Sequence, residues 1–132
     1  MQIKLNHIQF TDVTYHVSSL DKDITNELNT ILEITNKVSE FNSKEFTVKF
    51  TVELKNLTGT FKLILKATTQ FTSSEKLNDS FENSPFLKIN APAIAFPYIR
   101  TFISNFTLNT GYNPIVLPSF NFVEISEQQN KK

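Results

Sequence analysis

The most regular hydrophobic pattern in the chain is a strict alternation of apolar and polar residues in its middle third. Two alternating runs, residues 46–54 and residues 61–67, are separated by a segment of turn composition at residues 55–59. A period of two places all the apolar side chains of a strand on one face. The apolar positions are Phe46, Val48, Phe50, Val52 and Leu54, followed by Phe61, Leu63, Leu65 and Ala67. The two runs therefore predict an antiparallel hairpin with one buried face and one exposed face.

Two further extended segments precede this hairpin. Near the N-terminus, Ile8 and Phe10 share one phase of alternation, whereas the apolar residues between 13 and 17 share the other. A change of phase inside one strand predicts a β-bulge, here at residues 11–12. Residues 18–29 are polar and predict a crossover loop or a short helical turn around residues 23–28. After them, Leu32 and Ile34 predict another strand, with Val38 and Phe41 as its candidate continuation.

The second half of the chain predicts one main helix. Residues 75–84 are polar and rich in turn-forming residues, and Pro92 and Pro97 then bracket the helix start, where a missing N–H is tolerated. From Pro97 onward the apolar residues recur at the spacing i, i+3, i+4, i+7 of an amphipathic helix. These residues are Ile99, Phe102, Ile103 and Phe106. Gly111 follows as a natural residue to end the helix.

The C-terminal segment predicts no regular element. Residues 114–118 carry a proline at each end and predict an extended apolar strap that continues through Phe120 and Phe122, and residues 126–132 are polar and expected to fray. Strands followed by a helix, without strand–helix–strand alternation, predict an α+β fold with a four-stranded antiparallel sheet packed by one long helix. We expect a single domain over residues 1–132, with the sheet in 1–74, the linker and helix in 75–111, and the strap and tail in 112–132.

Composition narrows the possible functions. The charge is balanced, with 13 basic and 13 acidic residues, so no overall field attracts nucleic acid. The chain has no cysteine, which excludes disulfides and a cysteine nucleophile, and only two glycines, which argues against a phosphate-binding loop. No signal-peptide core or run of about 20 apolar residues occurs, so we expect a soluble cytoplasmic protein without direct membrane insertion.

Candidate chemistry is sparse. His7 and His16 have an odd spacing that puts them on opposite faces of a regular strand, and even a bulge between them would leave a weak metal site. Other acids have the spacing of outward-facing strand charges; they are Glu33, Glu40, Glu45 and Glu53. Lysines that could bind nucleic acid fall on the face opposite most phenylalanines, where stacking and phosphate contact cannot combine; they are Lys49, Lys62 and Lys66. We therefore predict no enzyme, no metal, no cofactor and no nucleic-acid partner.

Residues 90–100 carry the most specific signature in the chain. Within them, residues 94–100 read Ile-Ala-Phe-Pro-Tyr-Ile-Arg, and this stretch resembles the signature that opens the long helix of SecB, the bacterial export chaperone. The continuation is also similar, with a glycine, a proline and then a run that reads Leu-Pro-x-x-x-Phe. In this sequence these are Gly111, Pro114, Leu117, Pro118 and Phe122.

The resemblance to SecB implies an ATP-independent chaperone, or holdase, that binds unfolded preproteins and passes them to the SecA motor. It also implies a homotetramer, a dimer of dimers with the long helices between two sheets. The implied client-binding residues are Leu32, Ile34 and Phe41 on one wall and Ile115, Leu117, Phe120 and Phe122 on the strap. The implied core and oligomer contacts are Phe96, Tyr98, Ile99, Phe102, Ile103 and Phe106.

Departures from the SecB pattern concern docking on the motor. The family uses acids on the outer sheet face for docking; Asp12 remains, but its companion acid is replaced by His16, and the turn at residues 57–59 has no acid. The C-terminal helix of the family is reduced here to residues 124–127 and a short polar tail. Two alternatives to export are therefore a dedicated chaperone that protects an antitoxin in a toxin–antitoxin system, and a non-enzymatic protein-interaction module.

Overall fold

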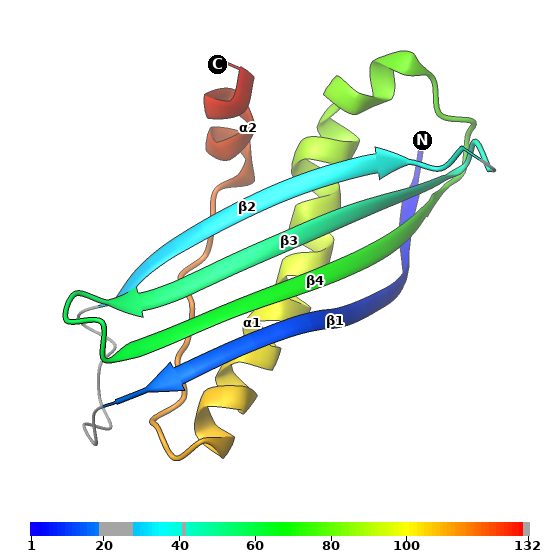
Figure 1. Ribbon diagram of the computed structural model, residues 1–132. Helices are drawn as coiled ribbons and strands as arrows, with labels where there is room; N and C mark the ends of the chain where they lie inside the picture. The colour runs from blue at the N-terminus through cyan, green and yellow to red at the C-terminus, as the bar shows by residue number, and fades with distance from the viewer. Residues whose placement is uncertain (19–27, 41, 131–132) are drawn as a thin grey trace.

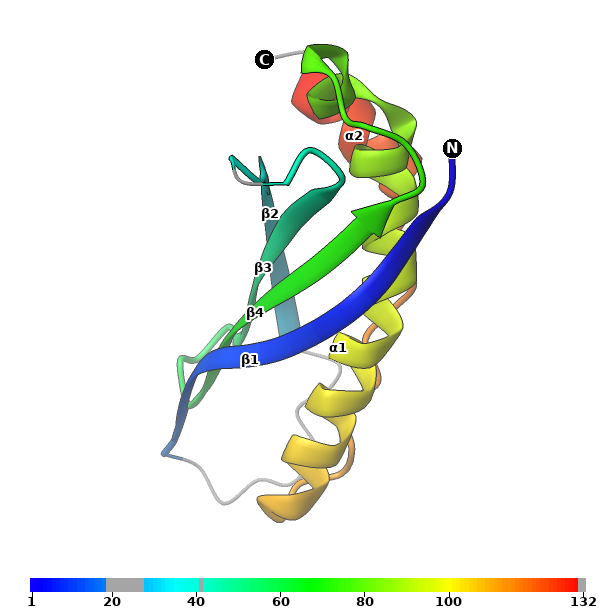
Figure 2. The same cartoon turned by 90° about the vertical axis from the view of Figure 1, so that its right-hand side faces the viewer.

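The computed structural model describes residues 1–18, 28–40 and 42–130, and it consists of one sheet with helices on one of its faces (Figures 1 and 2). The strands are β1 (Ile3–Val17), β2 (Leu28–Val38), β3 (Glu45–Asn56) and β4 (Phe61–Ser73). They form a four-stranded sheet in the order β1-β4-β3-β2, and all neighbouring strands are antiparallel. The helices are α1 (Ala91–Asn109) and α2 (Phe122–Asn130). The predicted α+β class is therefore confirmed. Most of the crossover predicted for residues 18–29 lies outside the described residues.

The hairpin of β3 and β4 forms the centre of the core, as the alternation predicts. Every second residue of both strands is buried on the face toward the helices. Phe46 is paired with Phe71 across the two strands, and their rings stack with centroids 5.1 Å apart. At the other end, the side chain of buried Asn56 accepts a hydrogen bond from the Phe61 N–H (3.1 Å) and closes the turn. The predicted hairpin is confirmed, with its loop at residues 57–60.

Strand β1 contains the predicted bulge and a second one. The pairing with β4 shifts between Phe10 and Asp12, as expected, and also between Leu5 and His7. The second shift was not predicted because too few apolar residues lie before it to reveal a change of phase. The bulge between Phe10 and Asp12 shifts the alternation of inward and outward side chains by one residue, so the apolar residues before and after it all face the helix layer.

The start of α1 differs from the prediction. The helix was expected to start between Pro92 and Pro97. It begins at Ala91, directly after a π-helical turn at Phe86–Asn90, and Pro97 lies inside it. A proline here removes only the hydrogen bond to the carbonyl of Ala93. Ala93 is exposed, so water can reach that part of the helix. Pro92 occupies the first turn, where proline costs nothing.

Helix α1 buries one face against the sheet and places aromatic residues against β1. Ile99 and Ile103 are fully buried on the sheet. Phe102 stacks on Phe10 of β1 with ring centroids 4.1 Å apart, and neighbouring aromatic rings extend this contact along the strand. The helix therefore lies closest to β1 and β4.

The C-terminal segment also departs from the prediction. The strap was expected to continue through Phe122 and then fray, but Phe122 begins α2, which extends to Asn130. The side chain of Asn121 accepts hydrogen bonds from the N–H groups of Val123 (3.1 Å) and Glu124 (3.2 Å). This is an N-terminal cap, which satisfies donors that a helix start otherwise leaves free.

Candidate functional site

The inner face of the edge strand β2 is only partly covered. Its residues Leu28, Leu32, Ile34 and Val38, which we call the β2 strip, are partly buried and pack against the core. Their partners on β3 are fully buried; Leu32 pairs with Val52, and Ile34 pairs with Phe50. Side chains on the inner face are less buried in β2 than in β3 because β2 is an edge strand and α1 lies nearer to the opposite edge of the sheet. Phe41, the third residue predicted for this wall, lies outside the described residues.

The strap, residues 113–121, lies beside α1 in the helix layer, on the side of β2 (Figures 1 and 2). A client-binding role requires accessible side chains, but three of the predicted residues of the strap are buried: Ile115, Leu117 and Phe122 are 3%, 2% and 8% exposed. Phe120 is partly buried, and its ring meets Phe96 edge-on at 5.0 Å. The accessible apolar side chain of the strap is instead Val116, which is 70% exposed.

Two hydroxyl groups of α1 hold the strap in place. Thr107 donates to the Ile103 carbonyl (2.8 Å) and accepts a hydrogen bond from the Ile115 N–H (2.9 Å). Ser104 donates to the Ile115 carbonyl (2.7 Å). Both backbone groups of Ile115 are thereby satisfied without a neighbouring strand, which explains how a segment with no regular pairing can bury its apolar residues.

The Thr107→Val variant is expected to lose about 1–3 kcal/mol of stability, because the buried Ile115 N–H then has no acceptor. Urea unfolding followed by circular dichroism measures the change. Thr101→Val is the matched control, since Thr101 makes a similar bond to the Pro97 carbonyl (3.0 Å) on the exposed side of the same helix. Equal losses in both variants would show that the strap does not depend on Thr107.

The helix residues predicted as core and oligomer contacts fall into three groups. Phe96, Ile99 and Ile103 are buried. Phe102 and Phe106 are partly buried against β1, whereas Tyr98 is 55% exposed. Tyr98 shares the outward face of α1 with Ile94 and Leu108, which are 39% and 54% exposed. This face is available for a contact with another molecule.

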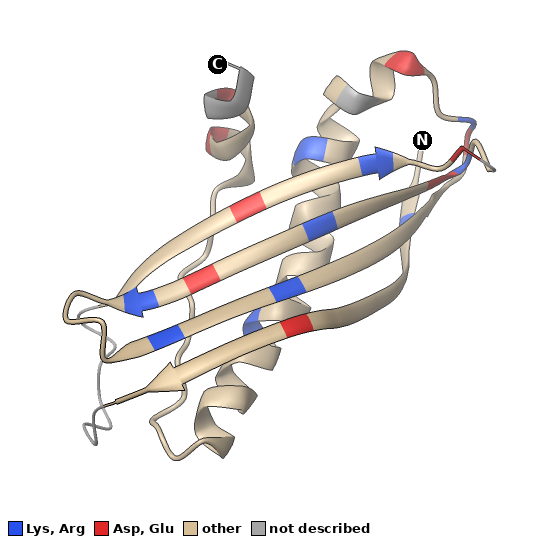
Figure 3. Cartoon of the chain, viewed as in Figure 1, with Lys and Arg blue, Asp and Glu red and all other residues tan. Residues whose placement is uncertain are grey.

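The outer face of the sheet carries charges of both signs (Figure 3). Asp12 is exposed and lies opposite Lys66 of β4, and Lys55 lies opposite Lys62. The lysines of this face point away from the layer that contains the core phenylalanines, as the alternation predicts. This outer face of the sheet therefore has no continuous acidic surface. Neither β3 nor β4 places an aromatic side chain on it that could stack on a base.

The two histidines of β1 lie far apart on the outer face of the sheet. His7 and His16 pair with Gln70 and Lys62, so they share the outer face but lie about 25 Å apart along the strand. The bulge between Phe10 and Asp12 brings both histidines to one face, and their separation rather than their orientation argues against a shared metal. Among the described residues no group of three metal-ligating side chains occurs. None of the described helices has the length and apolar character needed to cross a membrane.

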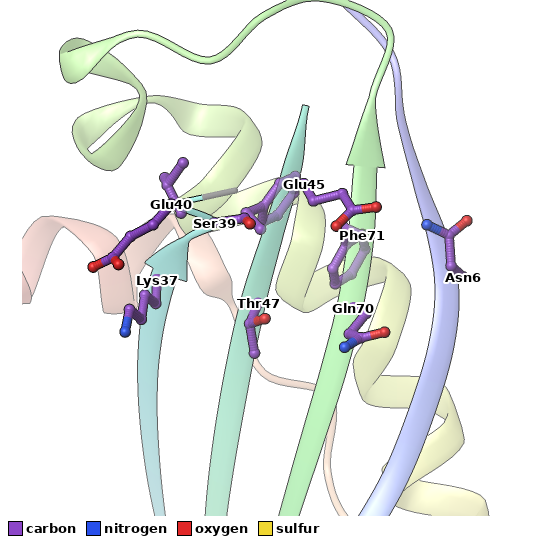
Figure 4. A pocket seen from close by; sticks show the side chains of 10 residues that line it. Asn6, Lys37, Ser39, Glu40, Glu45, Thr47, Gln70 and Phe71 are labelled. Atoms are coloured by element: carbon purple, nitrogen blue, oxygen red, sulfur yellow. The ribbon is translucent and has the colours of Figure 1, made fainter. Parts of the chain in front are cut away.

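A polar hollow of about 260 Å³ lies at the end of the sheet where β2 stops and β3 begins (Figure 4). It includes Glu40 and Glu45, and Figure 4 shows their carboxylates pointing in different directions. A catalytic carboxylate pair needs both groups directed at one reacting bond. The hollow therefore provides no paired carboxylates, and the partly covered apolar surface remains the best candidate site.

Comparison with known proteins gives one consistent family. The family model described as preprotein translocase subunit SecB matches residues 2–132. The protein-export protein SecB of Magnetococcus marinus is 31% identical over 91 residues, which cover 67% of this chain and 58% of that protein. SecB of Jannaschia sp. is 42% identical over 45 residues, which cover 34% of this chain and 26% of that protein. The chain thus aligns with less than two thirds of the length of either relative.

A solved structure shares the fold. The SecB-like chaperone Rv1957 of Mycobacterium tuberculosis, in complex with a ChAD peptide from the HigA1 antitoxin Rv1956, superimposes with a TM-score of 0.71 at 14% sequence identity. The superposition covers 90% of this chain and 88% of that one. The four strands and the long helix are therefore arranged as in that chaperone.

Proposed function

The chain belongs to the SecB family, and from this membership we propose that it is an ATP-independent chaperone that holds unfolded or preprotein chains on the β2 strip. The observation that carries the proposal is the partial burial of Leu32 and Ile34 at an edge of the sheet, beside fully buried neighbours. Apolar burial is non-directional, so such a strip can accept many sequences. We also propose one SecB-like domain over residues 1–132 and a cytoplasmic location, where precursors are synthesised before export.

The position of β2 gives the strip a second means of binding an extended chain. Among the described residues β2 is an edge strand, which pairs with β3 on one side only. The free side of an edge strand presents backbone N–H and C=O groups that an extended segment can pair with. Backbone pairing would supply affinity without sequence preference, and the half-covered apolar side chains would favour apolar clients.

The test is suppression of aggregation of a denatured model protein diluted into buffer, without nucleotide. We expect protection at a near-equimolar ratio, unaffected by ATP. A globular protein of similar size and charge is the control. Absence of protection, together with absence of binding to an unfolded chain, would refute the holdase function.

Protection of an antitoxin is the second candidate function. The structural neighbour Rv1957 was solved with an antitoxin peptide, and in this chain the outer sheet face, where Asp12 lies opposite Lys66, lacks a continuous acidic surface for the motor. Pull-down with purified SecA and with an antitoxin separates the two functions. Binding to SecA that is lost in Asp12→Asn would support export, and binding to the antitoxin alone would support the second function.

A homotetramer remains part of the proposal, with the outward face of α1 as a subunit contact. Tyr98 is 55% exposed on that face and is the largest of its exposed apolar side chains. We expect Tyr98→Ser to weaken association at least about tenfold, because buried tyrosines dominate many interfaces. Light scattering over a dilution series measures the assembly. Leu57→Ser, at an 80% exposed turn residue, is the control, and a strictly monomeric parent protein would contradict the proposal.

A further inference from the structure

Three lysines form a diagonal row across the outer face of the sheet, with one lysine on each of β2, β3 and β4. They are Lys37, Lys49 and Lys66, which we call the lysine row. Lys37 pairs with Thr47, two residues before Lys49, and Lys49 pairs with Thr68, two residues after Lys66. Figure 3 shows a basic position on each of these strands, in a line across the sheet. Diagonal neighbours on adjacent strands are about 7–8 Å apart, so the row presents positive charges at regular steps.

Two members of the row line a hollow of about 370 Å³ on the outer face. Lys37 and Lys49 are the only charged residues among the described ones that line it. The other side chains of the hollow include three threonines, which are Thr35, Thr47 and Thr68. Ammonium and hydroxyl groups both donate hydrogen bonds, and a carboxylate accepts them. The hollow is therefore suited to an acidic side chain.

The lysine row is not neutralised within the described part of the chain. All three lysines are exposed, and none of them forms an ion pair with a described residue. Acidic residues flank the row: Asp12 lies opposite Lys66, and Glu33 and Glu45 lie diagonally from the other two lysines. The three ammonium groups are therefore available to another molecule, and the flanking acids limit the length of the positive surface.

An extended peptide segment matches the spacing of the lysine row. Alternate side chains of an extended chain point to the same side and lie about 6.8 Å apart. Three acids at alternate positions can therefore contact three diagonal lysines. A longer polyanion such as a nucleic acid would also lie over Asp12 and Glu33, which would repel it. In addition, β3 and β4 place no aromatic side chain on this face that could stack on a base.

We propose that the lysine row binds a short extended segment of a partner protein that carries acidic residues at three alternate positions. The lysine row lies on the face of the sheet opposite the β2 strip, so the partner and an apolar client occupy different surfaces. The assembly proposed above, which uses the outward face of α1, leaves the outer sheet face accessible. The protein then has a second interaction surface, which recognises charge and spacing.

The test uses three fluorescent peptides of serine and one other residue, with binding measured by anisotropy at low salt. The first peptide has glutamate at three alternate positions, the second has glutamine at the same positions, and the third has three glutamates at every third position. We expect the first peptide to bind about tenfold more tightly than the second, since three exposed ion pairs together contribute about that factor. The third has the same charge but places its middle glutamate on the opposite side of an extended chain, so it should lose most of this gain.

Two double variants with the same change in net charge identify the surface. Lys37→Gln/Lys49→Gln removes both charges of the hollow and should weaken binding of the first peptide about fivefold. Lys55→Gln/Lys62→Gln removes two lysines of the same sheet face that lie opposite each other outside the row, and should leave Kd within about twofold. Circular dichroism checks that both variants are folded. An excess of denatured client should not displace the first peptide from the parent protein.

Four results would overturn the inference. They are equal binding of the three peptides, equal weakening in the two double variants, displacement of the peptide by the denatured client, and equally tight binding of a short thymidine oligonucleotide that Lys37→Gln/Lys49→Gln abolishes. The last result would assign the row to a phosphate backbone. Suppression of aggregation is measured in the same variants. Loss of peptide binding with clients still held would refute the lysine row alone, whereas peptide binding without any holding of clients would refute the holdase function alone.

Discussion

Replacing Phe71 with alanine is expected to lower the free energy of unfolding by about 3–5 kcal/mol. Phe71 has no exposed surface, and its ring stacks on that of Phe46 across the central hairpin. Phe46 in turn contacts Phe81, a residue of the linker before α1, with ring centroids 5.0 Å apart. The substitution therefore opens a cavity where sheet and linker meet. Because domains of this size are stable by only about 5–15 kcal/mol, the loss should be plain in urea unfolding followed by circular dichroism.

A matched control separates burial from side-chain size. Leu57→Ala removes an apolar side chain from the 80% exposed hairpin turn and should change stability by less than about 0.5 kcal/mol. A loss below about 1 kcal/mol in Phe71→Ala would mean that the pairing of Phe46 with Phe71 does not hold in solution. The register of β3 and β4 would then need revision.

The sheet could be predicted from the sequence because burial and strand period agree there. From Phe46 to Leu54 every second side chain is buried, and only one register of a strand achieves this. The bulge near Asp12 was also readable, because apolar residues on both sides of it reveal the change of phase. The bulge after Leu5 could not be predicted, because too few apolar residues lie before it to reveal a change of phase.

The helix boundaries were less predictable because local rules competed there. Pro97 has a strong preference for a first turn, yet tertiary packing of Ala91 and Ala95 on the sheet extends α1 before it. The start of α2 had a readable signal in Asn121, a good capping residue directly before an apolar one. The preceding prolines suggested an extended tail and masked that signal.

The candidate site depends on contacts that no local pattern reports. Ile115 and Leu117 have the same spacing as strand residues, but their burial depends on Thr107 and Ser104, which lie on another element. Arg100 belongs to the signature that identifies the family, and the burial of its Nε atom beside the strap becomes visible only in three dimensions. Partial exposure of the β2 strip likewise follows from the place of β2 at the sheet edge.

The double variant Leu32→Thr/Ile34→Thr is expected to weaken client binding about thirtyfold. A fully buried aliphatic side chain contributes about 1.5–3 kcal/mol, and because these two are already partly covered, each can add roughly 1 kcal/mol when a client covers the rest. Together they give about 2 kcal/mol, which corresponds to that change in Kd. Fluorescence anisotropy with an unfolded labelled protein measures it. Threonine keeps the strand propensity of β2, so the fold should be retained.

Ile31→Thr is the control for this double variant because it lies on the same strand and faces the opposite side of the sheet. Ile31 is 47% exposed and pairs with Glu53, so it offers apolar surface to solvent without belonging to the β2 strip. If clients bind the inner face, Ile31→Thr should leave Kd within about twofold, since a solvent-exposed position gains no further burial from the client. Equal weakening by Ile31→Thr would place clients on the outer face, and unchanged binding in the double variant would remove the β2 strip from the proposed site.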